Sequence, residues 1–358
     1  MCSRDRVAWA ITLAHAGGDD ELATMNVDAD ILIVGAGMAG AATAYHLARR
    51  TDLGVLIVEQ EETAGVHSSG RNAAIIREHA DEPALQKLLS DGAQFLRRGE
   101  LAEYEQRGLM VMGQGDDDVQ QYFPRAHGSG LWCPRDGTVD VAALLQSYLT
   151  EQNVRYETSV EDWSDEGDRL RVGTNRGDFT CRLLVNAAGP WAGRLGNLPL
   201  TPLKRHLFVT TPLDWLDPDG PSVWDGAAGF YFRPESGGLL LSCCDETVAE
   251  PGDYSEDPEL LLELAEKVEK HQPGLGELAV ARQWVGQRTF AADRLFVIGF
   301  DPRNDKLFHV GGLGGHGVTS SFSVGRMAAD LITGGRPPGA ELLSPRRLFS
   351  ANELNAGA

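Results

Sequence analysis

Three glycines and one glutamate have the types and the spacing needed to hold a dinucleotide. Gly35, Gly37 and Gly40 form a GxGxxG pattern, and Glu59 follows 19 positions after the third glycine. In such a pattern the first glycine permits a tight turn, the second lets a pyrophosphate approach the backbone, and the third lets a helix pack closely against a strand. The glutamate can accept hydrogen bonds from both ribose hydroxyls, and its charge would repel a 2′-phosphate.

The segments around these residues predict the unit that must position them. Residues 31–34 are a continuous apolar run, typical of a parallel strand that is buried on both faces. Residues 41–50 predict a helix with small residues toward the sheet, and residues 55–58 predict a second buried strand. This order places the phosphates at a helix N-terminus, where free N–H groups and a partial positive charge lie. The alternative interpretation is a glycine-rich turn without a ligand.

A long loop rich in serine and glycine follows the second strand and distinguishes FAD from NAD. Residues 61–74 form this loop, whereas a nicotinamide-binding fold normally proceeds to another helix there. A flavin ring must be bracketed by small residues and backbone donors, and residues 69–74 offer that chemistry. Here the sequence resembles the FAD-dependent D-amino-acid oxidase superfamily, which includes glycine oxidase, sarcosine oxidase, and D-amino-acid and D-arginine dehydrogenases. The resemblance implies FAD as the cofactor.

Two later segments are similar to cofactor motifs of the same superfamily. Residues 183–192 look like its second motif, a buried strand that ends in small residues. Residues 308–318 pass from a strand into a glycine-rich loop, and residues 319–332 predict a helix that aims its positive end at that loop. The alternative for this last motif alone is a glycine-rich helix start. The resemblance covers roughly residues 28 to 348, and the D-arginine dehydrogenases are the most similar members.

The resemblance assigns cofactor contacts to all of these segments. The expected contact residues are Gly35, Gly37, Met38, Ala39, Gly40, Glu59, Gln60, Ser68, Ser69, Gly70, Arg71, Asn72, Ala73, Ala74, Val160, Ala188, Gly189, Trp191, Gly312, Gly314, Gly315, Gly317 and Val318. Covalent attachment needs a Cys or His at a specific position facing the flavin, and no Cys lies near the C-terminal glycine loop. We therefore expect FAD to be bound non-covalently.

Four residues are candidates for contacts with the substrate. The resemblance places Arg288 where the superfamily binds a substrate carboxylate, whose two oxygens match the guanidinium fork. Tyr231 matches a tyrosine that hydrogen-bonds the substrate, and Arg205 aligns with a substrate-side arginine of the D-arginine dehydrogenases. His316 lies in the glycine loop and could touch flavin or substrate. Each residue has an alternative interpretation. Arg288 could form a salt bridge, and Tyr231 could be a buried aromatic residue of a strand. Arg205 could be an ordinary exposed arginine, and His316 could act only through its backbone.

Departures from the D-arginine dehydrogenases predict the class of substrate. Those enzymes carry a His and a Tyr after the flavin loop, where this sequence has Ile75 and Ala80. They also carry a carboxylate in the substrate domain at the position of Leu109. An apolar pocket is therefore expected, with a neutral or hydrophobic amino acid, in the D configuration that the resemblance implies, as the substrate.

The expected function is oxidation of an amino-acid C–N bond by hydride transfer to flavin. This reaction gives an imino acid and then a 2-oxo acid, and oxygen or a quinone is the expected electron acceptor. Three alternatives remain open from the sequence. They are a flavoprotein that oxidises a 2-hydroxy acid or a secondary amine, a non-catalytic FAD subunit of a larger oxidoreductase, and a tRNA-modifying flavoprotein.

The order of the predicted elements indicates an α/β fold class. We expect a Rossmann-like FAD-binding domain and a discontinuous α+β substrate domain built on a mostly antiparallel sheet. The expected boundaries are 1–27 for an N-terminal extension, 28–83, 137–201 and 280–348 for the FAD-binding domain, 84–136 and 202–279 for the substrate domain, and 349–358 for a tail.

Composition excludes several functions. The 358 residues carry a net charge of −20, which repels nucleic-acid phosphates, so no nucleic-acid partner is expected. The five cysteines show no CxxC pair and no accompanying His cluster, so we expect no metal site and a cytoplasmic location. No apolar run reaches the roughly 18 residues of a transmembrane segment. Residues 4–16 resemble a crude signal peptide, and the alternative is a disordered extension before a true start at Met25.

Overall fold

The computed structural model describes residues 27–80, 82–350 and 354. Most of the predicted N-terminal extension and of the tail lies outside these residues. Among the described residues the α-helices are α2 (Met38–Leu47), α3 (Gln86–Leu96), α4 (Val141–Leu149), α5 (Ala192–Gly196), α6 (Glu259–His271), α7 (Ser321–Ile332) and α8 (Ala340–Leu343). The strands of the eight-stranded sheet are β1 (Ala29–Val34), β2 (Val55–Val58), β8 (Asn153–Arg155), β9 (Val160–Asp165), β10 (Leu170–Thr174), β11 (Phe179–Asn186), β17 (Val297–Phe300) and β18 (Leu307–Gly311).

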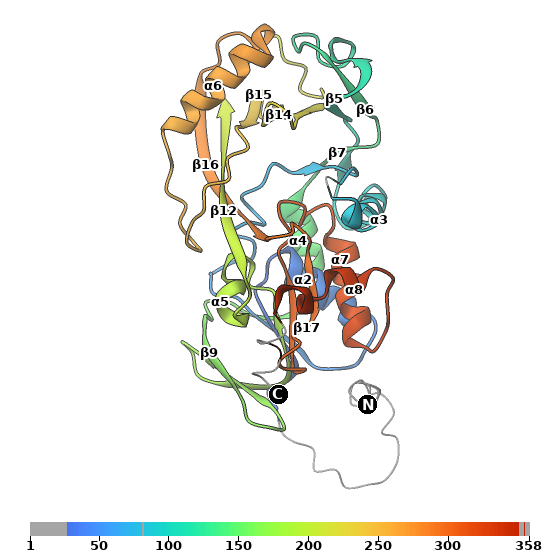
Figure 1. Ribbon diagram of the computed structural model, residues 1–358, viewed down its shortest axis with the longest axis vertical. Coiled ribbons are helices and arrows are strands. Elements are labelled where there is room, and N and C mark those ends of the chain that lie inside the picture. Colours follow the sequence, from blue (N-terminus) through green and yellow to red (C-terminus); the bar gives the residue numbers. More distant parts are fainter. Residues whose placement is uncertain (1–26, 81, 351–353, 355–358) are drawn as a thin grey trace.

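Two further sheets complete the fold (Figure 1). The seven-stranded sheet contains β5 (Leu109–Asp118), β6 (Ser129–Cys133), β12 (Leu200–Thr210), β13 (Ser222–Asp225), β14 (Phe230–Glu235), β15 (Gly238–Ser242) and β16 (Val280–Ala291). The three-stranded sheet contains β3 (Ile75–Ile76), β4 (Tyr104–Glu105) and β7 (Gly137–Val139). No helix among the described residues has the length and apolar character needed to cross a bilayer.

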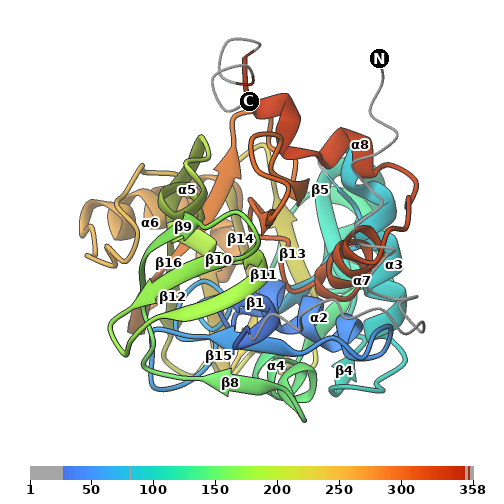
Figure 2. The ribbon, with the colours of Figure 1, turned by 90° about the horizontal axis from the view of Figure 1, so that it is seen from below.

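The central strands of the eight-stranded sheet are buried on both faces. Its main order is β17-β18-β11-β1-β2-β8, and β1 pairs in parallel with both β11 and β2. Ile31 and Ile33 join the core that includes residues of α2 and α7, whereas Leu32 joins a second core with residues of β10. Figure 2 shows α2 and α7 close together at this sheet. Burial on both faces explains why residues 31–34 are uniformly apolar.

The seven-stranded sheet has two different faces. One face is covered by α6, and the other faces the cavity. Its order is β16-β12-β15-β14-β13-β5-β6, and only β13 and β5 pair in parallel. Phe230 and Phe232 pack with Leu264 of α6, whereas the intervening Tyr231 packs with Leu207 on the opposite face. This alternation is the strand period of two. The predicted α/β class with a mostly antiparallel second sheet is confirmed.

Two long strands run between the parts of the molecule. β12 and β16 pair without interruption from Leu200 opposite Ala291 to Val209 opposite Arg282, and Figure 1 shows both running from the lower part of the fold to α6. Residues 280–291, which we assigned to the FAD-binding domain, thus form the edge strand of the seven-stranded sheet. The domain boundaries stay a prediction.

Candidate active site

The glycine loop after β1 is folded so tightly that side chains cannot be added. Gly35 has φ +105°, and a Cβ built on it would lie 2.6 Å from the carbonyl oxygen of Ala187. A Cβ on Gly40 would lie 2.0 Å from the carbonyl oxygen of Gly35. The first glycine therefore permits the turn and the third permits α2 to pack on it. The N-terminus of α2 is left beside the loop, as a dinucleotide phosphate requires.

Glu59 follows β2 and is aimed at the same turn. Its carboxylate accepts hydrogen bonds from the backbone N–H of Ala36 at 2.8 Å and of Glu61 at 3.1 Å. These two donors fix the orientation of the buried carboxylate. Each carboxylate oxygen has a further lone pair, so the group can still accept hydrogen bonds from ribose hydroxyls.

The serine- and glycine-rich loop is tied to the glycine loop and to itself. The N–H of Met38 donates to the hydroxyl of Ser69 at 3.0 Å. The side-chain oxygen of Asn72 accepts from the N–H of Ala74, which has a left-handed φ of 56°. The guanidinium of Arg71 lies 4.2 Å above the ring of Tyr254, a residue of a later loop. The loop is thus held at both ends before any ligand binds.

A single large cavity connects these segments. Its volume is about 920 Å³, and it runs along the glycine loop, Glu59, the segment 65–75, and the glycine loop 311–319. Every predicted cofactor residue lines it except Gly40 and Gly70. Both exceptions have packing roles, since a Cβ on Gly70 would lie 2.2 Å from the carbonyl oxygen of Gly65. The contacts that these residues make with a cofactor stay predictions.

Buried polar atoms without partners gather in this cavity. Among the described residues, such atoms include the hydroxyls of Ser68, Tyr231 and Thr289, and Nε and Nη1 of Arg205, and all four residues line the cavity. Buried polar groups in folded proteins are nearly always hydrogen-bonded. These orphaned atoms, together with the glycine turns, fit a large ligand with many polar groups, and FAD is such a ligand.

The C-terminal glycine loop makes room for Arg288. Gly315 has φ +87°, and a Cβ on it would lie 2.8 Å from Nε of Arg288. A Cβ on Gly314, with φ +51°, would lie 2.5 Å from the ring of Phe290. Two side chains of β16 therefore pack directly on the backbone of this loop. α7 begins at Ser321, shortly after the loop.

Arg288, Tyr231 and Arg205 come together on one face of the seven-stranded sheet. Leu203 of β12 pairs with Arg288 of β16, and Arg205 pairs with Gly286, so the two arginines are diagonal neighbours. Burial raises the pKa of Tyr231 above 10, so its hydroxyl stays a hydrogen-bond donor near neutral pH. Burial and the nearby charge of Arg205 lower the pKa of Arg288 from its usual value. The arrangement is a desolvated, positively charged wall that suits a carboxylate.

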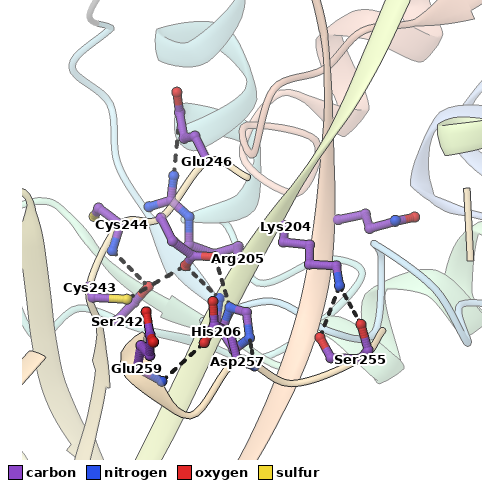
Figure 3. A network of polar contacts seen from close by, with 12 residues as sticks. Lys204, Arg205, His206, Ser242, Cys243, Cys244, Glu246, Ser255, Asp257 and Glu259 are labelled. Carbon is purple, nitrogen blue, oxygen red and sulfur yellow. Dashed lines mark hydrogen bonds and ion pairs between the residues drawn. The ribbon is translucent and has the colours of Figure 1, made fainter. Parts of the chain in front are cut away.

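The loop 243–258 borders the cavity through Cys244 and Glu246, and it is anchored to β12 through residues that alternate with Arg205. Lys204 donates to the hydroxyl of Ser255 at 2.6 Å, and Nδ1 of His206 contacts a carboxylate oxygen of Asp245 at 2.8 Å. Nε2 of His206 accepts from the N–H of Asp257 at 3.0 Å, which places the imidazole proton on Nδ1. Figure 3 shows Lys204 and His206 reaching this loop while Arg205 extends toward Glu246.

The comparisons with known proteins agree with this geometry. A family model for FAD-dependent oxidoreductases, the DAO family, matches residues 30–129 and 114–331. The chain belongs to this family. FAD is therefore its cofactor, and the chain is an oxidoreductase.

Curated relatives of this DAO-family chain have different lengths. FAD-dependent oxidoreductase domain-containing protein 1 of Xenopus laevis is 24% identical over 396 residues, covering 86% of this chain and 79% of that protein. Mitochondrial sarcosine dehydrogenase of Homo sapiens is 23% identical over 370 residues, covering 86% of this chain and 40% of that protein. The chain thus spans less than half of the sarcosine dehydrogenase. The predicted cytoplasmic location stays a prediction.

Solved structures share the fold. L-proline dehydrogenase from P. horikoshii superposes with a TM-score of 0.80 at 21% identity, covering 90% of this chain and 98% of that one. Glycine oxidase from Geobacillus kaustophilus superposes with a TM-score of 0.77 at 22% identity, covering 91% of this chain and all of that one, 100%.

Part of the predicted pocket composition is wrong. Leu109 is fully buried in β5 and does not line the cavity, nor does Ala80. Of the three residues, only Ile75 lines the cavity. The position of Leu109 was predicted from a strand alignment, and such an alignment does not indicate which face of the sheet a residue occupies. His316 lines the cavity as expected. Its role, like those of Arg288, Tyr231 and Arg205, stays a prediction.

Sequence reasoning missed several cavity residues of this DAO-family chain. Trp224 stacks on Tyr231 with 4.9 Å between ring centroids. Cys244, Glu246 and Arg294 also line the cavity. Cys244 has a left-handed φ of 57°. No motif marks the loop 243–258, so only the end of the preceding strand could have signalled it.

Proposed function

We propose that this chain oxidises the C–N bond of an amino acid to an imine, which water converts to a 2-oxo acid and an amine or ammonia. One observation carries the proposal. Among the described residues the guanidinium of Arg288 has no hydrogen-bond or carboxylate partner, yet it packs against the glycine loop expected to border the flavin. A half-buried guanidinium without a carboxylate partner favours a ligand that supplies the anion. The substrate carboxylate is that anion.

Arg288 and Tyr231 have complementary roles in this proposal. The guanidinium fork of Arg288 binds the two carboxylate oxygens, and the hydroxyl of Tyr231 donates a third hydrogen bond. The hydroxyl has no partner among the described residues, which leaves it available to the ligand. Fixing the carboxylate fixes the position of Cα relative to the cofactor, which is the contribution expected from orientation. Bound FAD supplies the acceptor for the hydride that leaves Cα.

The same cations favour the reactive form of the amine. A positive neighbour disfavours the charged form of an ammonium group, so Arg288 and Arg205 favour the neutral amine. The nitrogen lone pair then forms the C=N bond as the hydride departs, and the remaining N–H proton is lost to solvent. Water adds to the C=N bond and the C–N bond breaks. Electrons leave the cofactor to oxygen or a quinone, and this choice stays open.

The D configuration is part of the proposal and rests on the resemblance. The predicted neutral or hydrophobic side chain rested on Ile75 and Leu109. Since Leu109 lies outside the cavity, only Ile75 still supports the prediction of a neutral or hydrophobic substrate side chain. Apolar contacts remain available from Ile75, Leu207 and Trp224.

Anaerobic bleaching of the flavin absorbance tests the proposal directly. The purified holoprotein is mixed with D- and L-amino acids, N-methyl amino acids and 2-hydroxy acids. Reduction by amino acids is the expected result, and admitting air then separates an oxidase from a dehydrogenase. Reduction by 2-hydroxy acids alone would show that the bond oxidised is a C–O bond and not a C–N bond. A bound flavin that no compound reduces would point to a non-catalytic subunit.

A further inference from the structure

The cavity has a charge opposite to that of the whole molecule. Six arginines and four glutamates line it, whereas the chain as a whole has a net charge of −20. The basic residues are therefore concentrated where ligands bind. The lining residues are Arg71, Arg77, Arg194, Arg205, Arg288, Arg294, Glu59, Glu82, Glu161 and Glu246.

Besides Arg288, Arg205 is a buried cation of this set that the protein satisfies poorly. Its side chain is only 5% exposed, and its ion pair with Glu246 is long, 3.5 Å from Nη2. Glu246 is held more closely by Arg294, whose two terminal nitrogens contact the two carboxylate oxygens at 3.1 and 2.6 Å. Nε and Nη1 of Arg205 have no partner among the described residues. Glu246 thus neutralises Arg294 more than Arg205.

Arg205 and Arg288 together exceed the charge of one α-carboxylate. They are diagonal neighbours on one face of the sheet, and the positive charge of Arg205 lowers the pKa of Arg288. An amino acid with a neutral amine carries one negative charge per carboxylate. If Arg288 takes that carboxylate, Arg205 keeps only its long ion pair to Glu246, which Arg294 shares, and this is unfavourable for a buried charge.

We propose that Arg205 binds a second carboxylate, and that the substrate is an amino acid with two carboxylates. The second group is carried either by the side chain or by a substituent on the amine nitrogen. This inference rests on the proposed function, in which Arg288 and Tyr231 hold the α-carboxylate. It replaces the neutral side chain predicted from the sequence.

Matched substrate pairs test this inference. Under anaerobic conditions, flavin reduction is measured with aspartate against asparagine and glutamate against glutamine, in both enantiomers. A third pair is N-(carboxymethyl)alanine against its carboxamide, which distinguishes a nitrogen substituent from a side chain. We expect the dicarboxylate of at least one pair to react with an efficiency about 10- to 100-fold higher than its amide, as for a charge-assisted hydrogen bond.

Two variants separate the roles of the arginines. In Arg205→Gln the ratio of efficiencies between dicarboxylate and amide falls toward one. In Arg288→Gln both members of the pair lose efficiency together, so the ratio is kept. If Arg205→Gln instead lowers both members equally, Arg205 binds the same α-carboxylate as Arg288, and the inference is overturned.

A measurement on the unchanged protein covers the case in which Arg205→Gln fails to fold or to retain FAD. Succinate and butyrate are titrated as ligands that cannot react, and binding is followed through the visible flavin spectrum. We expect the dissociation constant of succinate to be lower than that of butyrate by a factor of at least about 10. Equal dissociation constants would overturn the inference. If succinate binds tightly but no amino acid reduces the flavin, the proposed function fails while the anion site stands.

Discussion

The guanidinium of Arg288 is positioned by packing against backbone, not by a carboxylate. Gly315 leaves it space, and Leu203 lies opposite it across the β12–β16 pair. Such a residue keeps its full hydrogen-bonding capacity for a ligand. Replacing it therefore changes binding of the substrate much more than it changes the fold.

We expect Arg288→Lys to raise the dissociation constant of the amino acid about 10-fold, and Arg288→Gln about 100-fold. Lysine keeps the charge but loses the two-pronged geometry, and glutamine loses both. The dependence of the anaerobic rate of flavin reduction on amino-acid concentration measures these constants. Arg282→Gln is the control, because Arg282 lies on the same strand and its exposed side chain pairs with Glu235. Equal effects in all three variants would show that Arg288 has no special contact with substrate.

Asp136 is a buried carboxyl whose ionisation opposes folding. Burial raises its pKa from 3.8 to about 6, and its Oδ2 atom has no hydrogen-bond partner among the described residues. The folded state therefore binds more protons than the unfolded state between about pH 4 and pH 6, so stability falls as pH rises through that window.

Asp136→Asn is therefore expected to increase the free energy of unfolding at pH 7 by about 1 to 3 kcal/mol. Asparagine keeps an oxygen to accept from the N–H of Glu78, which now donates to Asp136. Urea unfolding at pH 4 and pH 7 measures the change. The gain should be smaller at pH 4, where the carboxyl of the parent protein is protonated in the folded state; a gain independent of pH would contradict this account.

Among the elements, the β1–α2 unit depends most on single glycines. Gly35 permits the tight turn, and Gly40 permits the close contact of α2 with the loop and with β1. This unit was predictable because both its sequence pattern and its physical requirement are local. The predicted helix began at residue 41, whereas α2 begins at Met38, since the N–H of Ala41 already donates to the carbonyl of Gly37.

Gly40→Ala is expected to lower the free energy of unfolding by about 2 to 3 kcal/mol and to reduce FAD occupancy of the purified protein. The added Cβ meets backbone that cannot move without opening the turn. Gly54→Ala is the matched control, because its Cβ would lie 3.5 Å from its nearest neighbour, Asp30. The ratio of flavin to protein absorbance and thermal unfolding report the two effects. A fully flavinated Gly40→Ala protein would refute the expected link between turn and cofactor.

Other parts of the site depend on long-range register, which local sequence does not encode. Alternation along β12 turns Lys204 and His206 toward the loop 243–258 and Arg205 toward the cavity. A sequence predicts that neighbours face opposite ways, but not which face meets the cavity. The misplaced Leu109 has this cause, whereas Glu246 was missed because it lies in a loop that carries no motif. Arg288 was predicted as a substrate residue because the segment around it resembles a known family, and it lies in the cavity lining.

At the scale of the whole molecule, the cavity joins surfaces that come from distant parts of the chain. The eight-stranded sheet provides the glycine loop and Glu59, and the seven-stranded sheet provides Tyr231 and Arg288. A ligand that contacts both sheets stabilises the folded state by mass action.

FAD at 100 times its dissociation constant is expected to raise the melting temperature by roughly 3 to 5 °C, which corresponds to about 2.7 kcal/mol. Differential scanning fluorimetry of the apoprotein at increasing FAD concentration measures this rise. Riboflavin at the same concentration is the control ligand, because it lacks the pyrophosphate and adenosine that the glycine loop and Glu59 are expected to hold. An equal rise with riboflavin would mean that the glycine loop contributes no binding energy.

The order of strands in the eight-stranded sheet bears on how the protein emerges from the ribosome. β1 appears early, yet one neighbour, β11, is made some 150 residues later. The helix that packs on α2, α7, is synthesised only after the whole seven-stranded sheet. During translation the side of α2 that packs on α7 therefore stays uncovered until those strands have been made. A ribosome that stalls before residue 321 would hold a nascent chain with this surface exposed to chaperones.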